Sequence, residues 1–180
     1  MLNAYRHEDA ELLASHVADI IGPLAGLIGT ARTRADVDLV YVNDNYGDFT
    51  AEFGDIVRSA LDGAHPDLVK PIVPEGDYRF LSKVRHSAFY ATALAYLLRR
   101  LQTKHIVLTG QVTEQCILYT ALDAYVRHFP VLVPPDAVAD IDPELGAAAL
   151  TMMRRNTSVR TVRAAECLDR AADGSQGLLS

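Results

Sequence analysis

Apolar residues recur at intervals of three and four along residues 9–29, the spacing that places them on one face of an α-helix. We therefore predict an amphipathic helix there, with its apolar face packed on the protein core. The same spacing predicts helices over residues 88–101 and 116–128. A short helix is also expected over 51–61, and Pro143 suits the first turn of a helix over 143–155. The apolar positions of the first helix are Leu13, Val17, Ile20, Ile21, Leu24 and Ile28.

Short apolar runs separate these helices and predict strands over residues 37–42, 105–109, 131–133 and 158–162. Residues 63–66 suit a turn, and 71–74 suit a short extended segment. Because strands alternate with helices, the fold class is α/β, a three-layer sandwich with a mostly parallel, Rossmann-like sheet covered on both faces. We expect a single domain over residues 1–165 and a weakly ordered C-terminal tail over 166–180. Ligands of such sheets bind beyond the carboxyl ends of the strands.

Composition narrows the classes of partner. The 180 residues carry a net charge of -6 with a pI near 5.4, which disfavours nucleic acid and anionic membranes as partners. The sequence shows no uninterrupted apolar run of membrane-spanning length and no signal-peptide pattern, so a cytoplasmic location is expected. Cys116 and Cys167 lie far apart without metal-ligand spacing, which argues against a disulfide framework or a zinc site.

The main candidate for chemistry is a cysteine that follows the strand predicted at 105–109. The strand is followed by Gly110, and the predicted helix places Cys116 in its first turn. Unpaired N–H groups and the positive end of the helix dipole favour a thiolate at that position and can also hold an oxyanion. The alternative is that Cys116 is a small buried hydrophobe, as free cysteine often is.

Two motifs stand out in the sequence. They are Gly110, Thr113, Glu114 and Cys116, followed by Thr120, Ala121, Asp123 and Ala124, and upstream Lys83, Ser87, Ala88 and Phe89. With these motifs the chain resembles the isochorismatase-like cysteine hydrolases, a family that includes N-carbamoyl amidases, nicotinamidases and true isochorismatases. The resemblance extends over residues 1–162, and either motif alone would be only suggestive.

The resemblance implies roles for several residues. Cys116 would be the nucleophile, and Lys83 would lie beside the thiol, where a cation stabilises negative charge; an ordinary surface lysine is the alternative. The peptide bond Gln111–Val112 would be cis, so that the N–H groups of Val112 and Cys116 point at the oxyanion. Phe89 would be an apolar wall of the substrate pocket, or plain core.

The resemblance also exposes a missing part. In the family, a first apolar strand ends in a catalytic aspartate, and residues 1–5 resemble the residues immediately after that strand. Two explanations are open: the sequence begins downstream of the natural start, or the protein is a diverged member that has lost its acid. Asp9, Asp44 and Asp48 are the nearest carboxylates, but their spacing does not match the motif, and each suits a helix start or a loop.

Other polar residues are weaker candidates. Asn43 and Tyr46, on the loop after the strand at 37–42, are pocket candidates. Glu114 and Asp123 are expected to cap or pair with neighbours, and three histidines are interpreted as structural or surface residues. Nicotinamidases of this family bind zinc through an aspartate and two histidines on that loop, and no histidine is present there. We therefore expect no metal or other cofactor and disfavour a nicotinamidase. The three histidines are His86, His105 and His128.

The favoured function is metal-independent, cysteine-dependent hydrolysis of a C–N bond in a small amide or N-carbamoyl compound through a thioester, with weak activity because the acid is absent. One alternative is isochorismatase chemistry, the hydrolysis of a vinyl ether, which does not require the cysteine. Another is a non-catalytic binding or assembly protein on the same fold. The expected partners are a small-molecule substrate and further copies of the chain in a dimer or tetramer. Nothing in the sequence names the substrate.

Overall fold

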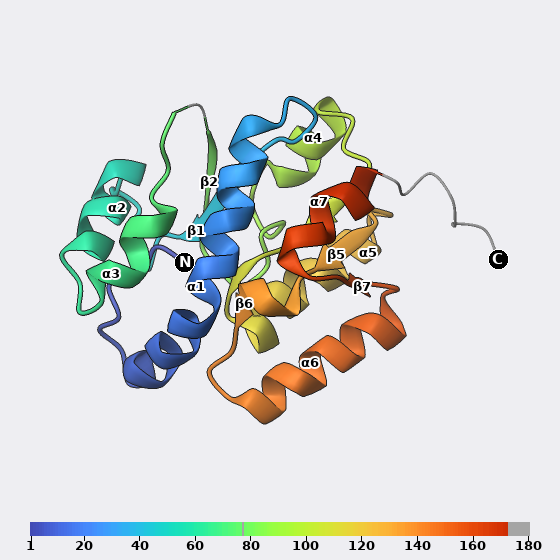
Figure 1. The fold of residues 1–180 in the computed structure, drawn as a ribbon. Helices are drawn as coiled ribbons and strands as arrows, with labels where there is room; N and C mark the ends of the chain where they lie inside the picture. Colours follow the sequence, from blue (N-terminus) through green and yellow to red (C-terminus); the bar gives the residue numbers. More distant parts are fainter. Residues whose placement is uncertain (77, 173–180) are drawn as a thin grey trace.

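The computed structural model describes residues 1–76 and 78–172, and Figure 1 shows how its elements are arranged. Helices and strands alternate along most of the chain. In chain order the elements are α1 (Ala10–Thr33), β1 (Val40–Asp44), α2 (Phe53–Leu61), α3 (Pro66–Val69), the 3₁₀ turn η1 (Lys70–Ile72), β2 (Arg79–Lys83), α4 (Leu94–Arg100), β3 (Ile106–Val107), β4 (Gly110–Gln111), the π-helical turn η2 (Thr113–Ile117), α5 (Leu118–Tyr125), β5 (Val131–Val133), the 3₁₀ turn η3 (Pro135–Ala137), β6 (Val138–Ala139), α6 (Pro143–Asn156), β7 (Arg160–Thr161) and α7 (Ala164–Ala172).

All strand pairs among the described residues are parallel. β1 pairs with β2, β5 lies between β3 and β7, and β4 pairs with β6. Parallel neighbours bring their carboxyl ends to one edge, which is where the side chains at the strand ends meet. The predicted α/β class with a mostly parallel sheet is confirmed.

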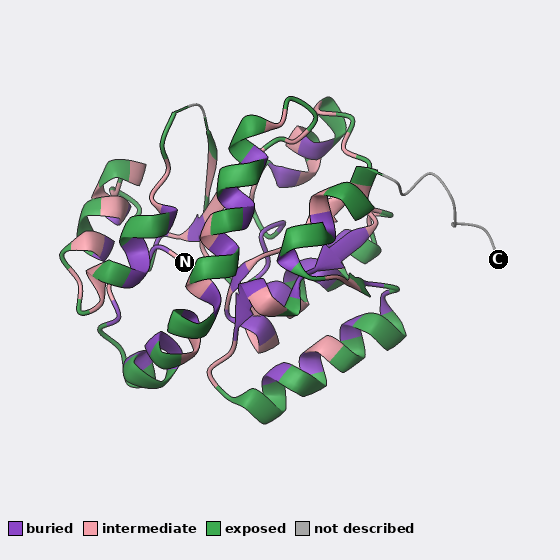
Figure 2. Cartoon of the chain, in the orientation of Figure 1, coloured by how far each residue is buried: buried purple, intermediate pink, exposed green. Residues whose placement is uncertain are grey.

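Two hydrophobic cores lie on opposite faces of the strands. One contains the buried side of α1 with residues of α2, α3 and α7, and the other contains residues of α4, α5 and α6. Neighbouring residues of β2 divide between them, because Phe80 packs against the first core and Leu81 against the second. The buried residues run along one side of α1 in Figure 2, while the outer side of α6 is exposed. The arrangement is the predicted three-layer sandwich.

A cavity of about 610 Å³ lies between β1 and β3. Of the described strands, β1 pairs with β2 alone and β3 pairs with β5 alone, so the edges that these two strands turn toward the cavity have no strand partner. Side chains of α1 and α7 line the cavity on one face, and side chains of α4 line it on the other.

The structure corrects several predicted boundaries. The helix predicted over 88–101 begins only at Leu94, and β2 was not predicted as a strand. Residues 66–72 are helical turns, where the sequence suggested an extended segment beginning at 71. The tail predicted over 166–180 is wrong up to Ala172, because α7 occupies Ala164–Ala172; residues 173–180 lie outside the described residues.

α1 bears on the expectation that no apolar run reaches membrane-spanning length. Within the described part of the chain it is the one helix long and apolar enough to cross a membrane. A core helix passes the same test of length and composition. One side of α1 is buried against α7, β6 and η1, which accounts for its apolar residues as part of the core.

Candidate active site

Lys83 and Asp44 end two paired strands, and the register of the parallel pair places them side by side. Lys83 Nζ donates to Asp44 Oδ2 at 3.0 Å, and the lysine is only 6% exposed. The other carboxylate oxygen, Asp44 Oδ1, accepts the N–H of Tyr46 at 2.8 Å. The carboxylate is therefore held from both sides, and the buried lysine has an ion-pair partner.

Cys116 lies on the other side of Lys83. Its Sγ is 3.7 Å from Lys83 Nζ, and the residue is half-buried at the wall of the cavity. A cation at this distance stabilises a thiolate and the negative charge that develops during attack on a carbonyl. The structure thus brings Cys116 and Lys83 together, as the resemblance implied, and adds Asp44, which the sequence analysis had interpreted as a loop carboxylate.

The turn that carries Cys116 differs from the predicted one. Cys116 is in the π-helical turn η2, and the α-helix α5 begins two residues later. The N–H of Ile117 donates to the carbonyl oxygen of Val112, five residues back, as the wider turn requires. Single π-helical turns of this kind are frequent at functional sites.

The peptide bond Gln111–Val112 is cis, as the resemblance implied. The Oε1 of Gln111 accepts a hydrogen bond from the hydroxyl of Tyr5 at 3.2 Å. Burial raises the pKa of Tyr5, so this hydroxyl stays protonated and donates. The N-terminal segment is thereby tied to the strand end that precedes Cys116.

The pocket candidates separate into two groups. Phe89 is 6% exposed and lines the same cavity as Cys116. Asn43 also lines the cavity, but its amide is engaged by the main chain of Leu2, accepting from the N–H and donating to the carbonyl oxygen, both at 3.1 Å. Tyr46 is 61% exposed and its hydroxyl donates to Leu2 O, so its contact is with the N-terminal segment.

The remaining carboxylates have structural contacts. Glu114 Oε1 accepts the N–H groups of Ile141 and Asp142, and Asp123 pairs with Arg127, as expected for capping or pairing residues. Asp48 accepts from Thr50 within its own loop, and these hydrogen bonds hold the pKa of its carboxyl below the usual range. Asp9 stands at the N-cap of α1 without a side-chain capping bond.

His86 is a site residue that the sequence analysis missed. It had been interpreted as structural or surface, but it lines the cavity with Cys116 and stacks on Tyr119, with ring centroids 5.3 Å apart. Its position three residues after Lys83 in the sequence was the one indication that it lies near the site. His105 also lines the cavity, and its pKa is lowered by burial and then by the charge of Arg160.

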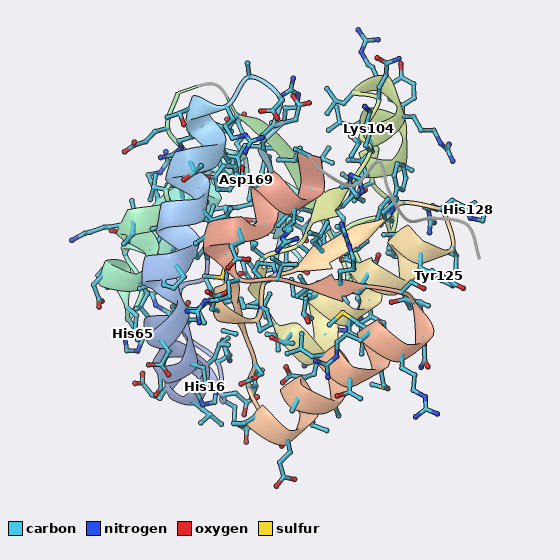
Figure 3. All side chains as sticks on the ribbon, turned by 45° about the vertical axis from the view of Figure 1, so that its right-hand side comes forward. His16, His65, Lys104, Tyr125, His128 and Asp169 are labelled. Carbon is cyan, nitrogen blue, oxygen red and sulfur yellow. The ribbon has the colours of Figure 1, made fainter. Side chains whose placement is uncertain are left out.

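No group of three or more histidine, cysteine, aspartate or glutamate side chains is placed to hold a metal ion among residues 1–76 and 78–172. The labelled histidines in Figure 3 illustrate this, because His16 and His65 lie on the side of α1 and His128 lies on the opposite side of the molecule. The expectation of a metal-independent site stays a prediction.

The fold and the site define a class of protein. It is an α/β protein with a half-buried thiol, a buried lysine and a carboxylate at the carboxyl edge of parallel strands. A model described as the Isochorismatase domain matches residues 1–166. The chain therefore belongs to the isochorismatase family, which confirms the resemblance.

Relatives and solved structures agree with this assignment. The chain is 37% identical over 154 residues to the isochorismatase family protein YaaI of Bacillus subtilis, covering 85% of this chain and 84% of YaaI. It is 28% identical over 148 residues to maleamate amidohydrolase of Pseudomonas putida, covering 77% and 68% of the two chains. The structure of N-carbamoylsarcosine amidase from Thermoplasma acidophilum is similar with a TM-score of 0.66 and 26% identity, covering 83% and 85%. Members of the family are hydrolases, including amidohydrolases.

Proposed function

We propose that this protein hydrolyses a C–N bond in a small amide or N-carbamoyl compound, with Cys116 as the nucleophile. The observation that carries the proposal is the position of Lys83 Nζ, 3.7 Å from Cys116 Sγ and 3.0 Å from Asp44 Oδ2. Two similar proteins, maleamate amidohydrolase and N-carbamoylsarcosine amidase, support an amide of a small acid as the class of substrate.

The first half of the proposed reaction forms a thioester. The Cys116 thiolate attacks the carbonyl carbon, and N–H groups of Val112 and Cys116 stabilise the oxyanion. Collapse breaks the C–N bond, and the leaving nitrogen takes one proton from the Lys83 ammonium, which lies next to the sulfur. Ammonia or an amine departs, and Lys83 is left neutral.

The second half restores the enzyme. A water molecule gives one proton to the neutral Lys83 amine and adds to the thioester carbonyl, and the C–S bond breaks to release the acid and the thiolate. Asp44 stabilises the recharged lysine through its ion pair. Over both halves one water is consumed, and the acid and the amine are the products. In this scheme Lys83 carries the proton in both halves of the reaction.

A burst assay with p-nitrophenyl acetate, followed by intact-protein mass spectrometry, tests the thioester. We expect one acetyl group on Cys116, none in the Cys116→Ser variant, and acylation slowed by about 10²-fold in Lys83→Met. Lys70→Met is the matched control, because Lys70 is exposed on η1 and its loss should leave the rate unchanged. Acetylation at another residue, or an equal rate in Lys83→Met, would overturn the mechanism.

Ammonia release from maleamate, N-carbamoylsarcosine and nicotinamide then measures turnover. The amidase proposal expects release with at least one amide and its loss in Cys116→Ser. Turnover of isochorismate that survives Cys116→Ala would instead support vinyl-ether hydrolysis. A folded protein that neither acetylates on Cys116 nor turns over any of these compounds would support the binding protein.

A further inference from the structure

The segment between β2 and α4, residues 84–93, carries Phe89 to the cavity but has no regular secondary structure. Ala91 in this segment adopts a positive φ of 53°, which is uncommon for a residue with a Cβ. A segment without a helix or strand ladder depends on side-chain contacts for its shape. Two of those contacts come from α5, the helix that begins just after Cys116.

α5 contacts the segment at two successive turns. Thr120 Oγ1 accepts the N–H of Ala88 at 3.0 Å. One turn further along, Asp123 Oδ2 accepts the hydroxyl of Ser87, and Ser87 Oγ in turn accepts the N–H of Phe89 at 3.2 Å. Asp123 is thus connected to the main chain of Phe89 through a single intervening hydroxyl.

A second connection from Asp123 reaches the aromatic ring. Asp123 Oδ1 pairs with Arg127, which also donates to the carbonyl oxygen of Asp123. The guanidinium carbon of Arg127 lies 5.0 Å from the centroid of the Phe89 ring, within range of a cation–π interaction. Both oxygens of one carboxylate therefore lead to Phe89, one to its backbone and one to its ring.

We propose that Asp123 is a positioning residue, which sets Phe89 as the wall of the substrate pocket and so determines which substrates reach the thiol. Phe89 is 6% exposed and shares the cavity with Cys116. The nucleophile and the support of the wall belong to one continuous run of helical turns, η2 and α5, which keeps their separation constant. An apolar, planar wall favours substrates with an apolar or planar acyl group.

The role in catalysis rests on the proposed hydrolase function, but the positioning itself can be measured without turnover. Cys116 is alkylated with iodoacetamide and with iodoacetanilide, which carries a phenyl ring, and the ratio of the two rate constants is recorded. Phe89→Ala enlarges the cavity that Phe89 and Cys116 both line, so the ratio should shift toward the bulkier reagent by about fivefold. Asp123→Ala should produce a similar shift, and the double variant should not exceed Phe89→Ala.

Variants that remove one connection at a time keep the test meaningful if Asp123→Ala folds poorly. Ser87→Ala removes the link to the backbone, and Arg127→Met removes the link to the ring, so each should give part of the shift. Asp55→Ala is the matched control, because it removes a carboxylate that pairs with an arginine on α2, away from the cavity. Three results would overturn the proposal. The ratio could be unchanged in Asp123→Ala, it could be unchanged in Phe89→Ala, or the effects of the two substitutions could be additive in the double variant.

If the protein turns over an amide, a second readout applies. Asp123→Ala should raise KM by about tenfold while kcat changes by less than about threefold, because the wall is displaced and the thiol–lysine pair is intact. A loss confined to kcat would contradict a role at the wall. Absence of turnover in the wild type would remove the hydrolase proposal, and the alkylation ratios would still decide the positioning role.

Discussion

The ammonium nitrogen of Lys83 lies 3.0 Å from Asp44 Oδ2, and these two residues are the last of two paired parallel strands. The lysine side chain is 7% exposed and the aspartate side chain is 28% exposed. Loss of Asp44 should therefore cost more stability than loss of Lys83. The partly exposed Asp44 carboxylate can be hydrated when its partner is removed, whereas the buried Lys83 ammonium cannot.

Stability measurements on the pair can test that asymmetry. We expect Asp44→Asn to lower the free energy of unfolding by about 3 kcal/mol, because it leaves a buried ammonium without its partner, and Lys83→Met to lower it by less. The double variant should be more stable than the sum of the two changes predicts. Urea denaturation of the four proteins measures this, and strictly additive effects would mean that the ion pair contributes no coupling.

The two thiols should react very differently in the native protein. Cys167 is fully buried in α7, and burial, followed by the charge of Asp136, raises its pKa to about 11, so the thiol stays neutral and unreactive near pH 8. Native protein at pH 8 should therefore incorporate one equivalent of iodoacetamide, at Cys116, and Cys116→Ser should incorporate none. Both cysteines should react in denaturant, and rapid native labelling of Cys167 would refute the packing of α7.

Two consecutive methionines of α6 provide a matched test of the core. Met153 is fully buried in the cluster with α4 and α5, whereas Met152 is 45% exposed. Met153→Ala should cost about 2–5 kcal/mol of stability, because it leaves a cavity, and Met152→Ala should stay within about 0.5 kcal/mol. Comparable losses in thermal denaturation would show that α6 does not present this face to the sheet.

A glycine pair tests the contact of the N-terminal segment with the turn after α2. A Cβ on Gly63 would lie 2.4 Å from the carbonyl oxygen of Ala4, whose position is also fixed by the N–H of Ala64 at 2.9 Å. Gly63→Ala should therefore destabilise the protein by about 1–3 kcal/mol. Gly26→Ala, on the exposed side of α1 with free space around it, should instead raise stability by about 0.5–1 kcal/mol. Equal changes in stability for the two variants would show that the N-terminal segment does not pack against the turn after α2.

Local patterns were sufficient where neighbouring residues decide the conformation. The predicted strand over 131–133 is β5, and the helix predicted over 143–155 is α6, with Pro143 in its first turn and Asp142 accepting the N–H groups of Glu144 and Leu145 as its cap. The predicted helix after residue 88 failed for the opposite reason. Hydrogen bonds to Thr120 and Asp123 on another helix hold that segment out of helical geometry. The spacing of apolar residues within 88–101 does not reveal these bonds.

The sequence by itself determined the α/β class, the family and the candidate pair of Cys116 and Lys83, because periodicity and motif spacing are properties of the chain order. Only the tertiary structure decided which carboxylate lies beside Lys83. Asp44 is 39 residues away in sequence and reaches the lysine through the register of β1 on β2. Tertiary packing also made His86 part of the cavity wall, and set β1 and β3 on either side of that cavity. Such contacts join residues distant in the chain, and strand register and packing set their distances rather than any local pattern.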